Sequence, residues 1–189
     1  MLSTYKLKQY LKQHLSKKRY KHTVQVAQVA KALAEIYNID PFKAAYASLA
    51  HDIAKEMSNE EAMEYIKKYH IKLDPSIVHN PNLAHGEIGA IILEKKFNCT
   101  DQEILDAVKW HTYGEKNMSL LSKLVYMADI IEPSRHFEGV DELRILAPIN
   151  LDQAILRFYD LCQGYFEENN QKMHLNTYEM IETIKEESL

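Results

Sequence analysis

The 189-residue sequence contains little glycine, proline or cysteine. Five glycines and five prolines leave few positions that favour loops or low-complexity segments. The two cysteines, Cys99 and Cys162, have no motif spacing, which indicates reduced thiols in a cytoplasmic protein. No apolar run approaches the length of a membrane span, and the basic N-terminal segment lacks the apolar stretch of a signal peptide. We therefore expect a soluble, cytoplasmic protein that does not enter a membrane.

Charge is small overall but unevenly distributed. The formal net charge of -4 argues against general nucleic-acid binding. Residues 1–21 carry seven Lys or Arg and no acidic residue, whereas residues 178–189 carry four Glu and one Lys. The basic start is compatible with two interpretations, a contact with a phosphate-bearing ligand or an ordinary solvated helix face.

The residue pattern predicts an all-α protein. The hydrophobic fraction of 46% is enough for a sizeable core, strong helix formers dominate, and no segment alternates like a hairpin strand. We expect a bundle of about eight to ten helices forming one domain over residues 1–189, with helical extensions at both ends packed on it. The expected helices cover residues 4–15, 18–37, 41–55, 58–69, 83–97, 100–111, 120–131, 140–148, 151–168 and 177–187.

The stretch Ala45–Glu56, AYASLAHDIAKE, organises the rest of the chain. Asp40 can cap this helix and Pro41 suits its first position. An apolar helix that faces the core ends here in adjacent His51 and Asp52. A buried imidazole beside a buried carboxylate costs several kcal/mol unless both are satisfied. A divalent metal ion would satisfy both, and the alternative is a surface ion pair on the last helical turn.

Nine histidines are many for this length, and several sit in apolar or glycine-rich contexts. Taken singly, each such residue is usually a satisfied core group or a helix terminus. Together they indicate a metal site of imidazole and carboxylate ligands, which suits iron, manganese or zinc. Six ligands are too many for one catalytic metal with an open position and about right for two metals that share a carboxylate. The six candidates are His22, His51, Asp52, His85, His111 and Asp129.

Cationic side chains accompany these candidates. Arg19 lies one turn before His22 on the same helix face, and Arg135 follows the helix that holds Asp129. A guanidinium can bind two phosphate oxygens at once, so both arginines are expected in a phosphate-binding pocket. Lys55 follows the His–Asp pair by about one helical turn, and two positions are equally compatible with the sequence: in this pocket or in solvent.

Four segments resemble a known enzyme family. The pattern of His22, His51–Asp52 and Asp129 resembles the HD-domain metal-dependent phosphohydrolases, and the additional His85 and His111 resemble the di-metal branch of that superfamily. The segments LAHGEIGA, WHTYG, YMADIIEPSR and FEGVDELR look like the YqeK family of symmetrical bis(5′-nucleosyl)-tetraphosphatases, which are bacterial di-iron enzymes. The resemblance covers about residues 19–177.

This resemblance implies hydrolysis of diadenosine tetraphosphate to two ADP. Two metals about 3.5–4 Å apart can hold a bridging hydroxide and neutralise phosphate oxygens. Asp52 is the expected bridging carboxylate, and either His85 or His111 could instead contact phosphate or protonate the leaving ADP. The metal assignment, with Asp52 shared, is His22, His51 and Asp129 for the first ion, and His85 and His111 for the second.

The sequence departs from the family pattern at three places. Tyr113 replaces a threonine, Glu138 replaces a proline, and His174–Thr177 reads HLNT where HPxT is usual. None is a candidate metal ligand, so these departures bear on nucleotide contacts. His174 and Thr177, at the start of the last helix, are candidates for contacts with ribose or phosphate. The full set of expected nucleotide or phosphate contacts is Arg19, Asp52, Lys55, His85, His111, Arg135, His174 and Thr177.

Three alternatives remain at this level: another HD-domain nucleotide phosphohydrolase, a non-catalytic nucleotide-sensing module, or a structural helical protein whose histidines belong to the core. The preferred hypothesis is a phosphoric anhydride hydrolase with two divalent ions, most simply iron, with manganese or zinc as alternatives. Its ligands would be a dinucleoside polyphosphate and an ADP-like or GDP-like product. A homodimer is compatible with the sequence.

Overall fold

The computed structural model describes residues 2–72, 81–169 and 172–187. Within these ranges the chain forms ten α-helices and one 3₁₀ helix, with no strand, which confirms the all-α prediction. None of these helices is long and apolar enough to cross a membrane. The helices are α1 Thr4–His14, α2 Lys17–Ile36, α3 Pro41–Ala50, α4 Asn59–Tyr69, η1 Pro81–Ala84, α5 His85–Phe97, α6 Gln102–Trp110, α7 Leu120–Ile131, α8 Val140–Leu146, α9 Leu151–Glu168 and α10 Leu175–Glu187.

Helix α3 begins as predicted but ends earlier than residue 55. The Asp40 side chain accepts hydrogen bonds from the N–H groups of residues 42 and 43, and Pro41 occupies the first turn. At the other end, the His51 ring bonds the Ser48 carbonyl at 2.6 Å. That carbonyl is the acceptor that the N–H of Asp52 would use if the helix continued. The chain instead passes through a series of turns over residues 51–56.

Helix α6 also begins slightly later than the expected start at residue 100. Asp101, not Thr100, is the N-cap residue, and it makes no side-chain capping bond. The Lys43 ammonium of α3 holds Asp101 and Glu103 at 2.8 Å each. The Asp101 carboxylate therefore pairs with a residue of another helix and does not cap the N-terminus of α6. The other predicted boundaries agree with the structure to within a few residues.

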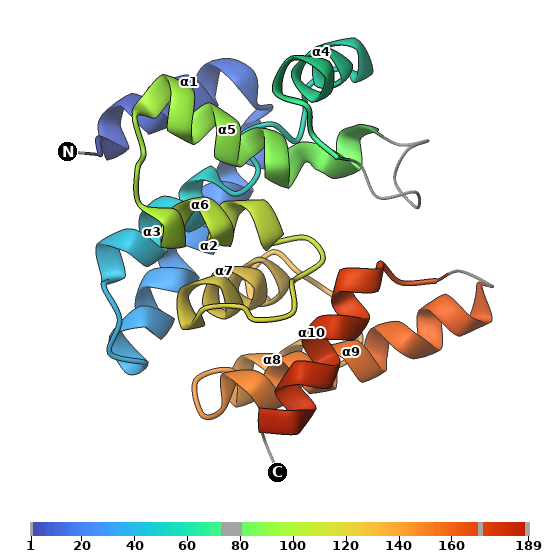
Figure 1. Cartoon of the computed structure of the whole chain (residues 1–189). Helices are drawn as coiled ribbons and strands as arrows, with labels where there is room; N and C mark the ends of the chain where they lie inside the picture. Colours follow the sequence, from blue (N-terminus) through green and yellow to red (C-terminus); the bar gives the residue numbers. More distant parts are fainter. Residues whose placement is uncertain (1, 73–80, 170–171, 188–189) are drawn as a thin grey trace.

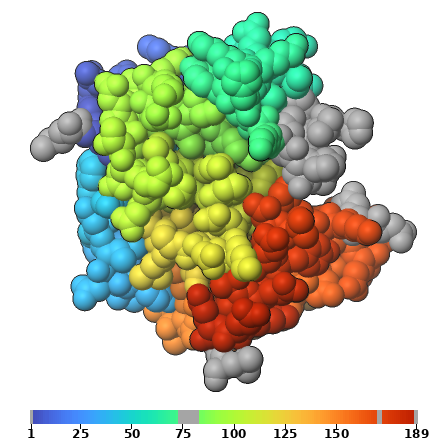
Figure 2. Space-filling view, viewed as in Figure 1, coloured from blue at the N-terminus to red at the C-terminus, as the bar shows by residue number. Residues whose placement is uncertain are grey.

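Helices α2, α3, α6 and α7 pack against one another and form the centre of the molecule. Helix α5 packs on α6, and α8 and α9 pack on α7 (Figure 1). Helix α10 lies against α9, and Figure 2 places it beside the segment that follows α6. There the Thr177 hydroxyl donates to the Tyr113 carbonyl at 2.9 Å. The C-terminal helices thus form one side of the region where α6 ends. The single-domain organisation of the whole chain stays a prediction.

A glycine allows α5 and α6 to approach closely. A Cβ atom at Gly86 would lie 2.4 Å from the Lys109 carbonyl oxygen, which belongs to the backbone of α6. Real Cβ atoms do not come this close, so any larger residue would push the two helices apart. Gly86 comes directly after His85 in the chain, and Lys109 comes shortly before His111. The close approach therefore helps to bring these two histidines together.

We expect Gly86→Ala to lower the free energy of unfolding by about 1–3 kcal/mol, because the added methyl group overpacks the α5–α6 contact. Gly164→Ala is the matched control, since a Cβ there meets nothing within 4 Å on the exposed side of α9. It should stabilise the protein by about 0.5–1 kcal/mol. Urea unfolding followed by circular dichroism measures both. Equal stabilities for the two variants would contradict the inferred contact.

Candidate metal centre and active site

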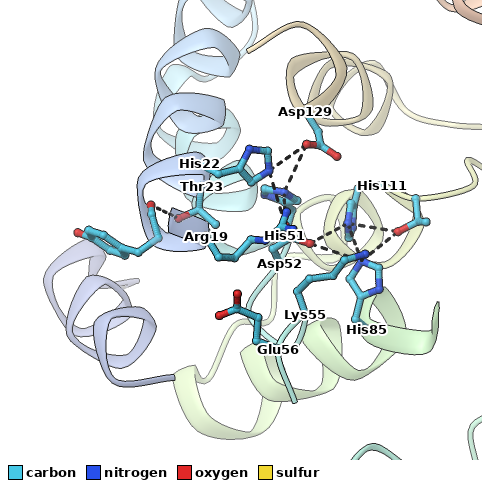
Figure 3. Close-up of polar contacts among 12 residues, drawn as sticks. Arg19, His22, Thr23, His51, Asp52, Lys55, Glu56, His85, His111 and Asp129 are labelled. Atoms are coloured by element: carbon cyan, nitrogen blue, oxygen red, sulfur yellow. Dashed lines mark hydrogen bonds and ion pairs between the residues drawn. The ribbon is translucent and has the colours of Figure 1, made fainter. Parts of the chain in front are cut away.

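All six predicted metal-site residues come together between the central helices (Figure 3). They reach this place from helix ends and from one helix interior. His22 projects from the second turn of α2, His51 and His111 are the C-cap residues of α3 and α6, and His85 begins α5. Asp129 lies near the end of α7. Five of the six are buried, and the Asp129 side chain retains 21% exposure.

Asp52 lies at the centre of this cluster, and its two carboxylate oxygens face different partners. Oδ2 is 3.2 Å from His51 Nε2 and 3.6 Å from His22 Nε2. Oδ1 is 3.5 Å from His85 Nε2 and 3.7 Å from His111 Nε2. The carboxylate therefore divides the histidines into the same two groups that the sequence predicted.

Asp129 completes the first group. Its Oδ1 lies 3.0 Å from His22 Nε2 and 3.9 Å from His51 Nε2. Ligand atoms of these three residues all lie within 4.8 Å of one another, as do those of a second trio, His51, Asp52 and His111. His51 thus belongs to both trios, and its assignment to the first ion stays a prediction. His85 Nε2 lies 3.1 Å from His111 Nε2, next to the second trio.

Two histidines are oriented by the backbone of their own helices. His51 Nδ1 contacts the Ser48 carbonyl at 2.6 Å, and His111 Nδ1 contacts the Val108 carbonyl at 2.7 Å. A carbonyl oxygen only accepts hydrogen bonds, so Nδ1 carries the proton in each pair. In the neutral ring the lone pair is then on Nε2, the atom that faces Asp52. Both imidazoles are fixed in the tautomer that a metal ligand needs.

His22 is oriented by a carboxylate that the sequence analysis missed. Its Nδ1 lies 3.2 Å from Glu132 Oε1, and Glu132 is fully buried. Burial raises the pKa of Glu132, but hydrogen bonds from Ser134 and His22 outweigh it and lower the pKa below its usual value. The ionised Glu132 accepts a hydrogen bond from the Nδ1–H group of His22, which leaves the Nε2 lone pair of the neutral ring directed toward Asp129. The signal in the sequence was an acidic residue directly after the apolar α7 run.

The donor set fits a divalent cation. His22 Nε2 and His51 Nε2 are buried nitrogen atoms without a hydrogen bond among the described residues, yet both lie beside carboxylate oxygens. Burial raises the pKa of the Asp52 carboxyl, but His51 and His111 hold it well below its usual value. Burial of Asp129 is similarly outweighed by its neighbours, among them His22, so its pKa is also lowered. Two ionised carboxylates and convergent imidazole nitrogens match the preferences of iron, manganese and zinc.

An open pocket of about 460 Å³ lies over the cluster and carries the three predicted phosphate-binding cations. Arg19 Nη1 is 2.8 Å from Asp52 Oδ2, and Arg135 Nη2 bonds Asp129 Oδ1 at 2.5 Å. Lys55 Nζ is 3.4 Å from His85 Nε2, which places it in the pocket rather than in solvent.

The predicted His174 and Thr177 lie outside the cluster and line a second cavity beside it. The His174 ring stacks on Tyr113 with ring centroids 4.2 Å apart. Thr112, which the sequence analysis did not single out, joins the two regions. Its hydroxyl oxygen is 3.2 Å from the Nε2 atoms of both His85 and His111. Its position within WHTYG was the available signal.

Fold and site together define an HD-domain protein. Residues 19–134 match the family described as HD domain, a span that begins at Arg19 and includes every residue of the cluster. Domains of this family that act as hydrolases bind divalent metal ions, in agreement with the convergent His and Asp side chains.

Comparison with known proteins narrows this class. A symmetrical bis(5′-nucleosyl)-tetraphosphatase of Bacillus subtilis is 38% identical over 169 residues, which cover 89% of this chain and 90% of the relative. One of Staphylococcus aureus is 36% identical over 142 residues, covering 75% and 73%. A crystal structure from Clostridium acetobutylicum, described as a predicted HD superfamily hydrolase involved in NAD metabolism, superposes with a TM-score of 0.93 at 38% identity and covers 99% of both chains. The chain belongs to the family of symmetrical bis(5′-nucleosyl)-tetraphosphatases.

We expect Glu132→Gln to weaken divalent-metal binding by about 10–100-fold, because a neutral amide oxygen accepts the hydrogen bond from His22 Nδ1 more weakly than an ionised carboxylate does. Metal retained per chain after dialysis against graded chelator concentrations measures this. Glu138→Gln is the matched control, since Glu138 is exposed and lies outside the cluster. Circular dichroism checks that both variants keep their helices. Wild-type metal retention by Glu132→Gln would rule out the orienting role.

Proposed function

We propose that the protein hydrolyses diadenosine tetraphosphate symmetrically, giving two molecules of ADP. The observation that carries the proposal is the central carboxylate of Asp52, whose two oxygens face two separate groups of imidazole nitrogens. The chain's membership of the symmetrical tetraphosphatase family supports the same reaction. No observation favours a sensing module or a structural protein over this activity.

We assign the first ion to His22, His51 and Asp129, and the second to His85 and His111, with Asp52 shared. The chemistry that divalent metals supply in such a site is activation of water and neutralisation of phosphate charge. The imidazole and carboxylate donors, with no thiolate among the described residues of the cluster, suit iron, manganese or zinc, and the family resemblance makes iron our first choice.

The remaining residues of the pocket act on the polyphosphate. Arg19 and Arg135 each contact one carboxylate of the cluster, so their guanidinium groups stand at the rim where phosphate oxygens would enter. Lys55 supplies a third cation beside His85. These contacts hold the two central phosphates over the cluster, and His85 or His111 remains the candidate for protonating the leaving ADP. We further infer a cytoplasmic enzyme whose products are ADP or similar nucleoside diphosphates.

The test is anaerobic purification with metal quantification, followed by product analysis on diadenosine tetraphosphate. We expect about two ions per chain and ADP as the only nucleotide product. Chelation should abolish turnover and lower the melting temperature, because an ion that binds only the folded state stabilises it. Formation of ATP and AMP, or full turnover by metal-free protein, would exclude the proposed reaction.

We expect Asp52→Asn to lose at least one ion and nearly all turnover, since it removes the charge shared by both ions while keeping the size of the side chain. His85→Ala should be milder and lose mainly the second ion, because His22, His51 and Asp129 remain in place. Metal content per chain, circular dichroism and hydrolysis rates are compared for the two variants. Two ions and near-normal turnover in Asp52→Asn, with loss of both in His85→Ala, would show that Asp52 is not shared.

A further inference from the structure

Arg135, one of the two arginines at the rim of the phosphate pocket, lies outside any helix. It belongs to residues 132–139, a segment of bends and turns that leads from α7 to α8. Its guanidinium group is held by Asp129, through the main-chain carbonyl at 2.9 Å and through the carboxylate. These bonds fix the head group of the side chain, but they do not hold the main chain from which it extends.

Arg144 of α8 holds this main chain. Its Nε atom donates to the Ile131 carbonyl at 3.0 Å, and its Nη2 atom donates to the carbonyls of Glu132 and Arg135 at 2.9 and 2.8 Å. Its Nη1 atom donates to the Asp141 carboxylate at 2.7 Å. The last carbonyls of a helix have no partner within that helix. One guanidinium group thus supplies donors to the end of α7 and to the segment that follows it.

Both main-chain polar groups of Arg135 depend on Arg144. The carbonyl is bound by Arg144 directly, and the N–H group donates at 3.0 Å to the Glu132 carbonyl, which Arg144 also binds. A guanidinium group presents five N–H donors in a fixed planar fork, which suits several acceptors at once. The described residues that line the pocket do not include Arg144, so any effect it has on a ligand passes through the residues that it holds.

We propose that Arg144 is a positioning residue, which places Arg135 at the phosphate pocket without itself touching the phosphate. The inference rests on the proposed function, because that function assigns phosphate binding to Arg135. The alternative is that Arg144 only stabilises the contact between α7 and α8. A purely stabilising role does not require Arg135, whereas a positioning role has no effect on the ligand once Arg135 is absent.

The first measurement is made on Arg144→Met in metal-loaded protein. Methionine keeps an unbranched side chain but offers no N–H donor. We expect ADP binding, measured by isothermal titration calorimetry, to weaken about tenfold, because a misplaced Arg135 loses charge-assisted hydrogen bonds to phosphate. The KM for diadenosine tetraphosphate should rise by a similar factor, whereas kcat and metal content should change less than about twofold.

Arg157→Met is the matched control. Arg157 ties α9 to α8 through Glu142 at 2.9 Å, so its loss also removes a contact of α8, but it does not line the pocket. Exposed ion pairs of this kind contribute little, and we expect the ADP affinity to change less than about twofold.

The second measurement repeats Arg144→Met in an Arg135→Ala background. We expect a further loss of ADP affinity of less than about twofold, because the guanidinium group that Arg144 positions is gone. Similar losses from Arg144→Met in both backgrounds, or wild-type ADP affinity in the single variant, would overturn the positioning role.

Arg144→Lys keeps the test decisive if Arg144→Met does not fold, which circular dichroism shows. The lysine retains a positive charge near the end of α7, which favours the helix, but its single ammonium group cannot reproduce the planar fork. We expect ADP affinity to fall about threefold or more, and wild-type affinity would overturn the proposal. If the wild type hydrolyses diadenosine tetraphosphate and the Arg144 variants bind ADP normally, only the positioning role is wrong. If ADP binding depends on Arg144 but the wild type does not hydrolyse that substrate, the proposed function is wrong and the positioning role stands.

Discussion

Negative charge held inside a helical core is the constraint on which the rest of the structure depends. The Asp52 carboxylate is almost fully buried, and Asp129 is only partly exposed beside it. Two carboxylates this close are costly in a low-dielectric interior unless cations or hydrogen-bond donors surround them. The fold supplies four imidazoles and two guanidinium groups around the pair. A divalent ion would add the strongest compensation, which makes metal binding and folding interdependent.

Helix termini deliver most of these side chains. His51, His85 and His111 each stand at the end or beginning of a helix, and the short helices α3 and α6 stop at their histidines. Where a helix ends, the following residue can also point its side chain into the site. Asp52, just after the end of α3, does so without interrupting a helix. The close contact at Gly86 then sets how near one terminus lies to another. Packing between helices, rather than loop conformation, therefore determines the geometry of the cluster.

Much of the fold could be predicted because its signals are local, such as the cap at Asp40 and the helical periodicity of the apolar residues. The cluster was also predictable, because several polar residues occupied positions that ought to be apolar. What failed depended on distant partners. Lys43 of α3 forms an ion pair with Asp101, so the start of α6 depends on a residue of another helix. Glu132 looked like an ordinary residue after a helix, and its role becomes visible only when α2 brings His22 against it.

The backbone hydrogen bonds of His51 and His111 also affect how the family can diverge. Their orientation comes from main-chain carbonyls at Ser48 and Val108, which are present whatever side chain occupies those positions. No single substitution at either position can remove the acceptor. His22 differs, because its orientation depends on the side chain of Glu132. Mutational drift can therefore change the orientation of His22 through a supporting residue, whereas the orientation of His51 and His111 changes only if the histidines themselves are replaced.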